Sequence, residues 1–329
     1  MKDGILVLNK PQNWTSHDCV AVCRRIMKLK GVKKIGHGGT LDPMACGVLP
    51  IYIGKATRLM EYTDLDDKTY RCTARFGLIT DTLDIWGETL EERSTENLTE
   101  EAVREALCSF RGEIEQIPPK YSAVRVNGRK LYQYAREGIE VEVQPRKVTV
   151  KKLEIESVDL DKREVSFEVT CSKGTYIRTI CSDLGEILGC GAVMSALTRV
   201  ASGIFRIEDG VDPEALKTMS GEEIERFIID TDKPLVHFGR IEMNADRARY
   251  FSMGNSIRWN QIRIAAEPAL TDAGLKNKRG RSYSTLYSVY RSDTGEFMGT
   301  GYHDEKEGLL KADKILIERG KGNENIQFT

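Results

Sequence analysis

Apolar residues recur with two different periods and divide the first 205 residues into expected strands and helices. Alternation predicts strands over residues 4–9, 68–78, 146–155 and 164–171, and a continuous apolar run predicts a buried strand over 48–53. Apolar positions at helical spacing predict helices that start near residues 16, 56, 99, 130 and 176. Thr15 and Asp18 predict a capping box at the first of these helices, and Asn127-Gly128 predicts a two-residue hairpin turn. A further strand is expected over 194–205. This mixture predicts an α+β domain built on a mixed sheet with helices.

The last hundred residues show a different pattern. Residues 206–234 hold short acidic helices and are expected to connect two domains. Beyond them, a helix over 247–253 precedes strands expected at 287–291, 297–302 and 309–316, which indicates a small β-rich module. The basic segment 276–281 is expected to form a loop that is either disordered or facing RNA.

Composition narrows the class of protein. The chain has 329 residues, 30% of them charged, and a net charge of −1. Its apolar runs fall short of the roughly 20 residues that cross a bilayer, and the N-terminus leads directly into a strand, so we expect no signal peptide. The eight cysteines form no C-x-x-C pair, and no histidine stands at zinc-ligand spacing from a cysteine pair. These features favour reduced thiols in a cytoplasmic protein and disfavour a zinc site.

The charge is unevenly distributed although its sum is near zero. Residues 1–60 hold ten lysines and arginines against three acids, a local net charge of +7, whereas residues 81–116 are strongly acidic. This asymmetry indicates one basic face, the electrostatic signature of a site for a polyanion. The alternative is a lysine-rich helix end that is simply solvated.

One loop differs from any core segment. Residues 36–50 hold four glycines and two prolines around a single acid, Asp42. Glycine and proline both disfavour regular structure, and the buried strand expected at 48–53 would hold the loop in place. A lone carboxylate on such a loop is a candidate catalytic acid. The alternative is a turn aspartate that hydrogen-bonds its own backbone.

This loop, GHGGTLDPMACGVLP, resembles the catalytic loop of the TruB-type tRNA pseudouridine synthases, whose pattern is roughly GHTGTLDPxATGVLP. Other motifs of that family match in family order up to about residue 210, and the match is weak after about residue 235. They are GILVLNKP at 4–11 with Thr15 and Ser16, KTY at 68–70, residues 77–84, IPPKYSA at 117–123, CSKGTYIRT at 171–179 and residues 184–192. The resemblance implies the pseudouridine synthase fold, with a mainly antiparallel sheet, followed by a small β-barrel-like PUA domain that grips RNA.

The resemblance also implies an activity, the isomerisation of uridine-55 to pseudouridine in the T loop of tRNA. The uracil leaves the ribose, rotates and rejoins through C5, so we expect no cofactor and no metal. Asp42 would act as nucleophile or charge stabiliser, by attack on C6, by attack on C1′ or through a glycal. Arg178 would be its partner, because a nearby guanidinium favours an ionised carboxylate. The helix dipole does not favour an arginine in a first turn, which argues for a function over an ordinary surface arginine.

The same resemblance assigns substrate contacts. Tyr70 would stack on the flipped uracil and could remove the C5 proton, although alone it would be taken for a core aromatic of a strand. Tyr176 and Leu197 would line the uracil pocket, and from the residues alone neither is distinguishable from core. His37, expected to be exposed between glycines, would enter the T loop where the base was. Lys10 would be structural or would contact a phosphate.

Four positions depart from the family pattern. Gly38 and Cys46 stand where threonine is usual, Asn13 replaces a usual glycine, and Thr198 stands where an arginine is usual after Leu197. These departures bear on the fine positioning of the substrate.

Together these features predict three segments: a catalytic domain over 1–235 with an RNA-binding insertion near 118–150, a PUA-like domain over 236–320 and a tail over 321–329. The expected partner is the T-arm stem-loop of tRNA, with no membrane, no obligate protein partner and a monomeric chain. One alternative is the same fold acting on another RNA, and a second is a non-catalytic RNA-binding or RNA-folding chaperone. A phosphate loop at 54–57 is excluded, since Leu49 stands where its first glycine is required.

Overall fold

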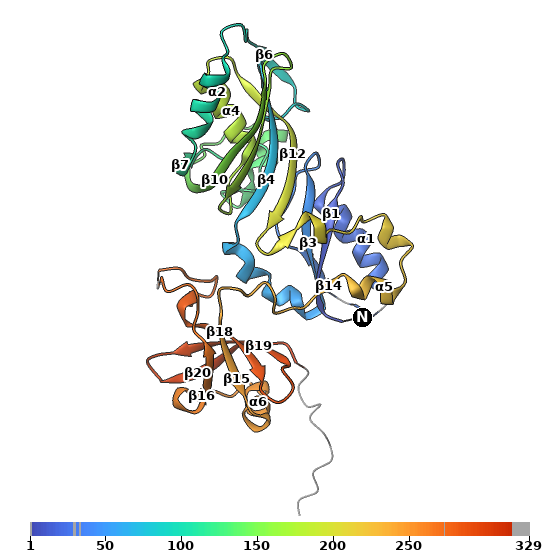
Figure 1. Ribbon diagram of the computed structural model, residues 1–329, viewed down its shortest axis with the longest axis vertical. Coiled ribbons are helices and arrows are strands. Elements are labelled where there is room, and N and C mark those ends of the chain that lie inside the picture. Colours follow the sequence, from blue (N-terminus) through green and yellow to red (C-terminus); the bar gives the residue numbers. More distant parts are fainter. Residues whose placement is uncertain (1, 29–30, 33, 273, 318–329) are drawn as a thin grey trace, which may run out of the picture.

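The protein is described by a computed structural model over residues 2–28, 31–32, 34–272 and 274–317. A ten-stranded sheet spans residues 4–229, and a six-stranded sheet spans residues 239–315 (Figure 1). The tail expected at 321–329 lies outside the described residues, as do Lys30 and Lys33, two of the ten basic residues counted in segment 1–60.

The large sheet is mixed and mainly antiparallel, as the sequence predicted. Its strands run in the order β14 (Ile228–Ile229), β1 (Gly4–Lys10), β3 (Cys46–Ile53), β12 (Ala192–Ser202), β4 (Lys68–Phe76), β11 (Glu164–Cys171), β10 (Arg146–Asp159) and β7 (Gly112–Gln116). Two short strands join from the side, β2 (Ile35–His37) on β3 and β13 (Phe205–Arg206) on β12. Two hairpins stand apart, β5 (Leu78–Thr80) with β6 (Thr89–Glu92) and β8 (Arg125–Val126) with β9 (Arg129–Lys130).

The helices begin close to the positions that the sequence predicted. They are α1 (Ser16–Lys28), α2 (Glu100–Cys108), α3 (Leu131–Arg136), α4 (Ile177–Ile187), α5 (Gly221–Arg226) and α6 (Ala245–Ser252). The predicted capping box of α1 is confirmed, since Thr15 N donates to Asp18 Oδ2 at 2.7 Å and Asp18 N donates to Thr15 Oγ1 at 3.0 Å. The predicted hairpin turn is confirmed by the positive φ angles of Asn127 and Gly128.

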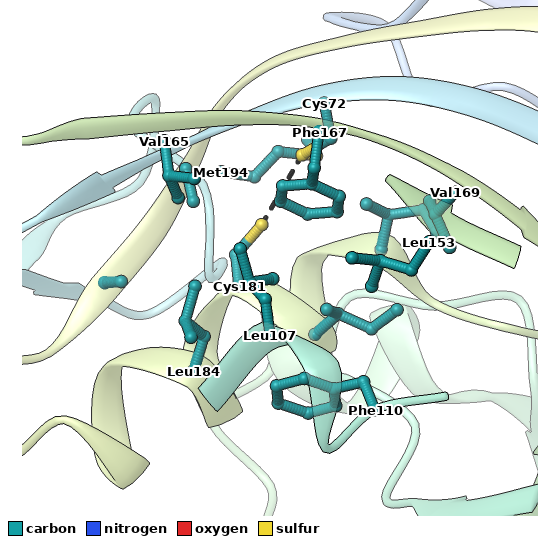
Figure 2. Close-up of a cluster of buried hydrophobic side chains, with 14 of the residues drawn as sticks. Cys72, Leu107, Phe110, Leu153, Val165, Phe167, Val169, Cys181, Leu184 and Met194 are labelled. Carbon is teal, nitrogen blue, oxygen red and sulfur yellow. Dashed lines mark hydrogen bonds between the residues drawn. The ribbon is translucent and has the colours of Figure 1, made fainter. Parts of the chain in front are cut away.

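One half of the large sheet packs against α2 and α4. The side chains of β4 alternate as predicted, so that Cys72, Ala74 and Phe76 face this core. Figure 2 shows Phe167 and Val169 of β11 above Leu107 of α2, with the Sγ atoms of Cys72 and Cys181 3.5 Å apart. The free, mostly buried cysteines agree with the expectation of reduced thiols.

The other half of the sheet packs against α1, α5 and the 3₁₀ turn η3 (Ala215–Lys217) (Figure 1). Cys19, Val20 and Cys23 of α1 cover Leu6 of β1 and Ile51 of β3. The two halves of the sheet therefore have separate apolar cores, and they meet where β3 lies beside β12.

The junction between β3 and β12 is parallel and short. Cys46 pairs with Thr198, and Gly47 pairs with Arg199. Gly47 has a φ of +99°, and a Cβ there would lie 2.2 Å from the carbonyl oxygen of Arg199. Glycine is thus required both by the backbone conformation and by the close approach of the two strands.

The sequence predicted three details differently. The helix expected at 56–62 is the longer 3₁₀ helix η1 (Gly54–Leu65), and the strand expected at 194–205 turns at Gly203 to give β12 and β13. The segment expected to connect two domains holds the predicted short acidic helices, among them the 3₁₀ turn η2 (Ile207–Asp209), but it also contributes β14 to the edge of the large sheet. Short elements of this kind depend on tertiary pairing more than on local pattern.

The C-terminal sheet is curled into a half-barrel, with α6 against it (Figure 1). Its strands run in the order β16 (Ile257–Arg258), β20 (Leu309–Ile315), β19 (Phe297–Asp304), β18 (Leu286–Arg291), β15 (Gly239–Met243) and β17 (Arg263–Ala266). Two further 3₁₀ turns are η4 (Trp259–Gln261) and η5 (Tyr283–Thr285). An apolar cluster that includes Leu59 and Tyr62 of η1 and Phe238, Tyr283 and Leu316 joins this module to the first.

The basic loop at 276–281 lies against its own module. Arg279 Nη1 is 3.1 Å from Asp313 Oδ1, Arg281 also pairs with Asp313, and the Arg281 guanidinium lies over the Tyr302 ring at 4.0 Å. Both arginines thus pair with a buried carboxylate of their own module, while the Arg279 side chain stays 47% exposed. Contact of this loop with RNA stays a prediction.

We predict that Gly47→Ala destabilises the protein more than Gly112→Ala. Both glycines have φ near +100°, but no described atom lies within 4 Å of a Cβ at Gly112. Gly112→Ala should lower the free energy of unfolding by about 1–2 kcal/mol from strain alone. Gly47→Ala should lower it by about 2–5 kcal/mol, because a backbone clash is added. Urea unfolding followed by circular dichroism measures both, and equal losses would contradict the close approach.

Candidate active site

The loop that carries Asp42 is fastened by a buried lysine. Lys10, fully buried at the end of β1, donates from Nζ to the carbonyl oxygens of Pro11 at 2.9 Å, Pro43 at 3.1 Å and Trp14. Burial lowers the pKa of the Lys10 ammonium. Of the two roles that the sequence left open for Lys10, this geometry supports the structural one, since its donors are taken by main-chain carbonyls.

Two further contacts fix the residues on either side of Asp42. The Ser16 hydroxyl, almost fully buried, donates to Leu41 O at 3.0 Å and accepts from Leu41 N at 2.8 Å. Asn13 N donates to Pro43 O at 2.9 Å from a residue with a φ of +66°. Asparagine tolerates this left-handed conformation, which explains how it replaces the glycine that is usual there.

Asp42 and Arg178 meet as predicted. Arg178 Nη2 lies 2.9 Å from Asp42 Oδ2; the arginine side chain is 6% exposed and the carboxylate 45% exposed. The guanidinium also donates from Nη1 to Thr82 O at 2.9 Å and from Nη2 to Tyr121 O at 3.0 Å, and its Nη1 lies 3.7 Å from Asp84 Oδ2. A buried cation with several partners thus faces a carboxylate that remains open to solvent.

Tyr70 lies on β4, with Arg199 of β12 as its cross-strand partner. Burial raises the pKa of the Tyr70 phenol; the Arg199 guanidinium opposes this shift, and the Asp42 carboxylate adds to it. Tyr70 packs against the cluster that contains Leu197, which is 9% exposed on β12. The structure therefore brings Tyr70 and Leu197 to the side of the sheet that meets the loop between β2 and β3, residues 38–45, which we call the Asp42 loop.

Arg199 received no role from the sequence analysis. It is 1% exposed and donates from Nε to Val48 O at 2.7 Å and from Nη2 to Gly39 O at 3.1 Å. It ties β12 to the start of β3 and to the loop before Asp42. The family pattern has an arginine at the position of Thr198, and this chain carries an arginine one residue later. Within an expected strand and without a charged neighbour, Arg199 gave no sequence signal of its structural role.

Tyr176 directly precedes α4 and is half-buried. Its main-chain N donates to Gln116 Oε1 at 2.9 Å, and its carbonyl accepts from Gln116 Nε2 at 3.1 Å. The sequence singled out Tyr176 but carried no signal for Gln116, because the two residues are 60 positions apart.

His37 differs from the expectation of an exposed loop residue. It ends strand β2 and is half-buried, and its Nδ1 is buried without a hydrogen-bond partner among the described residues. Burial lowers the pKa of the His37 imidazole, which favours the neutral form. At the next residue, a Cβ on Gly38 would lie 2.8 Å from Cε2 of Tyr52, so the tyrosine ring occupies the space of the usual threonine.

Among the residues that the structure describes, no group of three or more His, Cys, Asp or Glu side chains could hold a metal ion. Within the same residues, no helix is long and apolar enough to cross a membrane.

Comparison with solved structures gives the fold. A chain in the crystal structure of a Cbf5–Nop10–Gar1 complex matches with a TM-score of 0.67 and 25% identity, over 96% of this chain and 84% of that one. A chain of an archaeal box H/ACA Nop10–Cbf5 complex matches with a TM-score of 0.67 and 24% identity, over 96% of this chain and 87% of that one.

The family models define the class as pseudouridine synthase. Residues 24–177 match the TruB family pseudouridylate synthase N-terminal domain, and residues 178–236 match the tRNA pseudouridylate synthase B C-terminal domain. The tRNA pseudouridine synthase B of Clostridium perfringens is 38% identical over 96% of this chain and 99% of the relative, and that of Geobacillus kaustophilus is 46% identical over 78% and 91%. The chain belongs to the tRNA pseudouridine synthase B family.

We predict that Ser16→Ala loosens the Asp42 loop. The change leaves Leu41 N and O without their buried partner, and an unmade buried hydrogen bond costs about 1–3 kcal/mol. Amide exchange at Leu41, followed by mass spectrometry on the peptide that covers 38–46, should therefore accelerate about 5- to 150-fold.

Ser220→Ala is the matched control, since it also removes a hydroxyl that accepts from a main-chain N–H, at 3.2 Å from Glu223 N. It should leave exchange in the loop unchanged. Unchanged exchange at Leu41 in Ser16→Ala would show that the hydroxyl does not hold the loop.

Proposed function

We propose that this chain converts uridine-55 in the T loop of tRNA to pseudouridine. The observation that carries the proposal is the 2.9 Å contact between Asp42 and Arg178 in a chain of this family. In the reaction the bond from N1 to C1′ breaks, a bond from C5 to C1′ forms, and the proton of C5 is lost while N1 gains one. The reaction is an isomerisation and uses no external redox partner or group donor.

Asp42 is the proposed nucleophile or charge stabiliser. Its carboxylate is open to solvent on one side and contacts a buried guanidinium on the other. This arrangement suits a group that must stay ionised and still reach a nucleoside. Attack on C6, attack on C1′ and elimination to a glycal all use the same carboxylate.

The proposed uracil pocket is formed by Tyr70, Tyr176 and Leu197. Flipping a base out of folded RNA costs a few kcal/mol of free energy, and stacking of the base on an aromatic ring can offset this cost. The raised pKa of Tyr70 keeps its phenol protonated at neutral pH. We therefore propose stacking on the uracil as the main role of Tyr70. The Arg199 guanidinium would stabilise the negative phenolate if the hydroxyl loses its proton.

Contacts to the rest of the T arm are proposed for three regions. The insertion near 118–150 exposes several cations, namely Lys120, Arg125, Arg129, Arg136, Arg146 and Lys147. His37, neutral and next to the Asp42 loop, is proposed to occupy the space that the flipped base vacates. The module over 236–320, which follows the proposed catalytic domain over 1–235, is proposed to be a PUA-like domain that grips RNA. The whole chain is proposed to act as a cytoplasmic monomer.

We predict that Asp42→Asn abolishes product formation and keeps RNA binding. A uridine-labelled T-arm hairpin is incubated with protein, without metal or nucleotide, and pseudouridine is measured. The neutral amide cannot act as nucleophile, so the rate should fall on the order of 10⁴-fold or more. A second RNA that lacks the T-loop sequence tests whether another RNA is the substrate.

Asp159→Asn is the control for Asp42→Asn, since Asp159 is also a solvent-open acid in an ion pair, 2.8 Å from Lys162. It should retain full activity. Turnover by Asp42→Asn would remove the carboxylate from its proposed role, and a wild-type protein that makes no pseudouridine would remove the proposed function.

We predict that Tyr70→Leu and Tyr70→Phe differ. Leucine loses the stack, which is worth about 1–3 kcal/mol per base, so single-turnover rates should fall about 5- to 150-fold or further if the hydroxyl also acts. Phenylalanine keeps the aromatic ring, so the rate of Tyr70→Phe relative to wild type measures the contribution of the hydroxyl alone. Both variants should bind the hairpin within a few fold of wild type; a Tyr70→Leu rate equal to that of wild type would contradict stacking.

A further inference from the structure

Gln116 stands at the root of the insertion. It is the last residue of β7, at the edge of the large sheet, and it is 2% exposed. Its register partner is Arg146, the first residue of β10. The chain therefore leaves the sheet at Gln116, forms the insertion, and returns to the sheet directly opposite.

The side-chain amide of Gln116 forms hydrogen bonds with both main-chain groups of Tyr176, its N–H and its carbonyl. Oε1 accepts from Tyr176 N at 2.9 Å, and Nε2 donates to Tyr176 O at 3.1 Å. This is the pattern that a neighbouring strand would supply, here supplied by a side chain. Tyr176 is the residue from which α4 starts, and Arg178 is the second residue of that helix.

A second contact joins the same two segments. Arg178 Nη2 donates to Tyr121 O, at 3.0 Å, inside the insertion. The same Nη2 lies 2.9 Å from Asp42 Oδ2. The start of α4 is thus attached at two points. The main chain of Tyr176 binds Gln116 at the root of the insertion, and the Arg178 guanidinium, which contacts Asp42, binds Tyr121 inside it.

We propose that Gln116 is a positioning residue, whose amide fixes the main chain before α4 so that Arg178 meets Asp42 in the correct geometry while the insertion is held at the same point. This inference rests on the proposed function. Gln116 acts only through Tyr176 and Arg178, and it couples the segment proposed to bind RNA to the proposed reacting carboxylate.

The requirement for an amide is specific. Alanine leaves the N–H of Tyr176 without its buried partner and leaves the carbonyl with the helical bond from Ile180 N at 3.3 Å alone, so the start of α4 can shift. A shift near 1 Å in a catalytic group costs about 10² in rate. Glutamate keeps an acceptor for Tyr176 N, but its ionised form places a negative oxygen against Tyr176 O. Its protonated form restores the donor.

The experiment compares wild type, Gln116→Ala and Gln116→Glu on the uridine-labelled T-arm hairpin. Single-turnover rates are measured between pH 5.5 and 8, and hairpin affinity is measured separately. Gln116→Ala should lose about 10- to 100-fold in rate and keep its affinity within about threefold. The rate of Gln116→Glu, divided by that of wild type, should rise as the pH falls, because the buried carboxyl gains its proton.

Arg111→Ala is the matched control. Arg111 directly precedes the other end of β7, where it donates twice to Leu153 O, at 3.2 Å and 2.7 Å. Its removal also deletes two hydrogen bonds from a side chain to the main chain at this sheet edge, but it leaves Tyr176 untouched. Its rate should stay within about threefold of wild type.

The outcomes are distinct. A wild-type protein without activity overturns the proposed function, whereas an active wild type with an equally active Gln116→Ala overturns this inference alone. A pH profile of Gln116→Glu parallel to that of wild type also overturns it, since a merely structural loss would not follow the carboxyl proton. If circular dichroism shows that Gln116→Ala does not fold, the profile of Gln116→Glu decides.

Discussion

The contact between Asp42 and Arg178 is the interaction on which the rest of the candidate site depends. A guanidinium this buried needs partners for its donors, and it finds them on Thr82, Tyr121 and Asp84 as well as on Asp42. These partners belong to three separate stretches of chain. The guanidinium therefore has all of these partners only when the loop between β5 and β6, the insertion and the Asp42 loop are in place together. The geometry of the Asp42–Arg178 pair thus depends on the whole site.

The Asp42 loop has little regular structure, so its main-chain groups must find other partners. Side chains supply them: Lys10 binds Pro43 O, Ser16 binds both main-chain groups of Leu41, and Arg199 binds Gly39 O. Each of these side chains is almost completely buried. The loop is thus held by polar contacts from β1, α1 and β12, and it presents a carboxylate that is 45% exposed.

How much could be predicted from the sequence depended on whether a feature is local. The alternation in β4, the capping box at Thr15 and the turn at Asn127 depend on residues that are neighbours in the sequence, and they were predicted. The pair of Asp42 and Arg178 was predicted only because the motifs resemble those of a known family. Gln116 and Arg199 act on partners far away in the sequence, and a lone buried polar residue gives no periodic signal. His37 was misplaced because flanking glycines suggested an exposed loop, whereas pairing of β2 with β3 half-buries it.

The position of the site in the sheet follows from these contacts. The Asp42 loop leads into β3, a strand of the half that packs on α1, whereas Tyr70 and Arg178 belong to the half that packs on α2 and α4. The two halves meet along the short parallel pairing of β3 with β12, where Gly47 lets the strands approach closely and Arg199 crosses to Val48 and Gly39. A small displacement at this junction would move the carboxylate relative to the guanidinium and the tyrosine together. The glycine and the buried arginine at the junction therefore bear on the chemistry of the site, although neither belongs to the proposed uracil pocket.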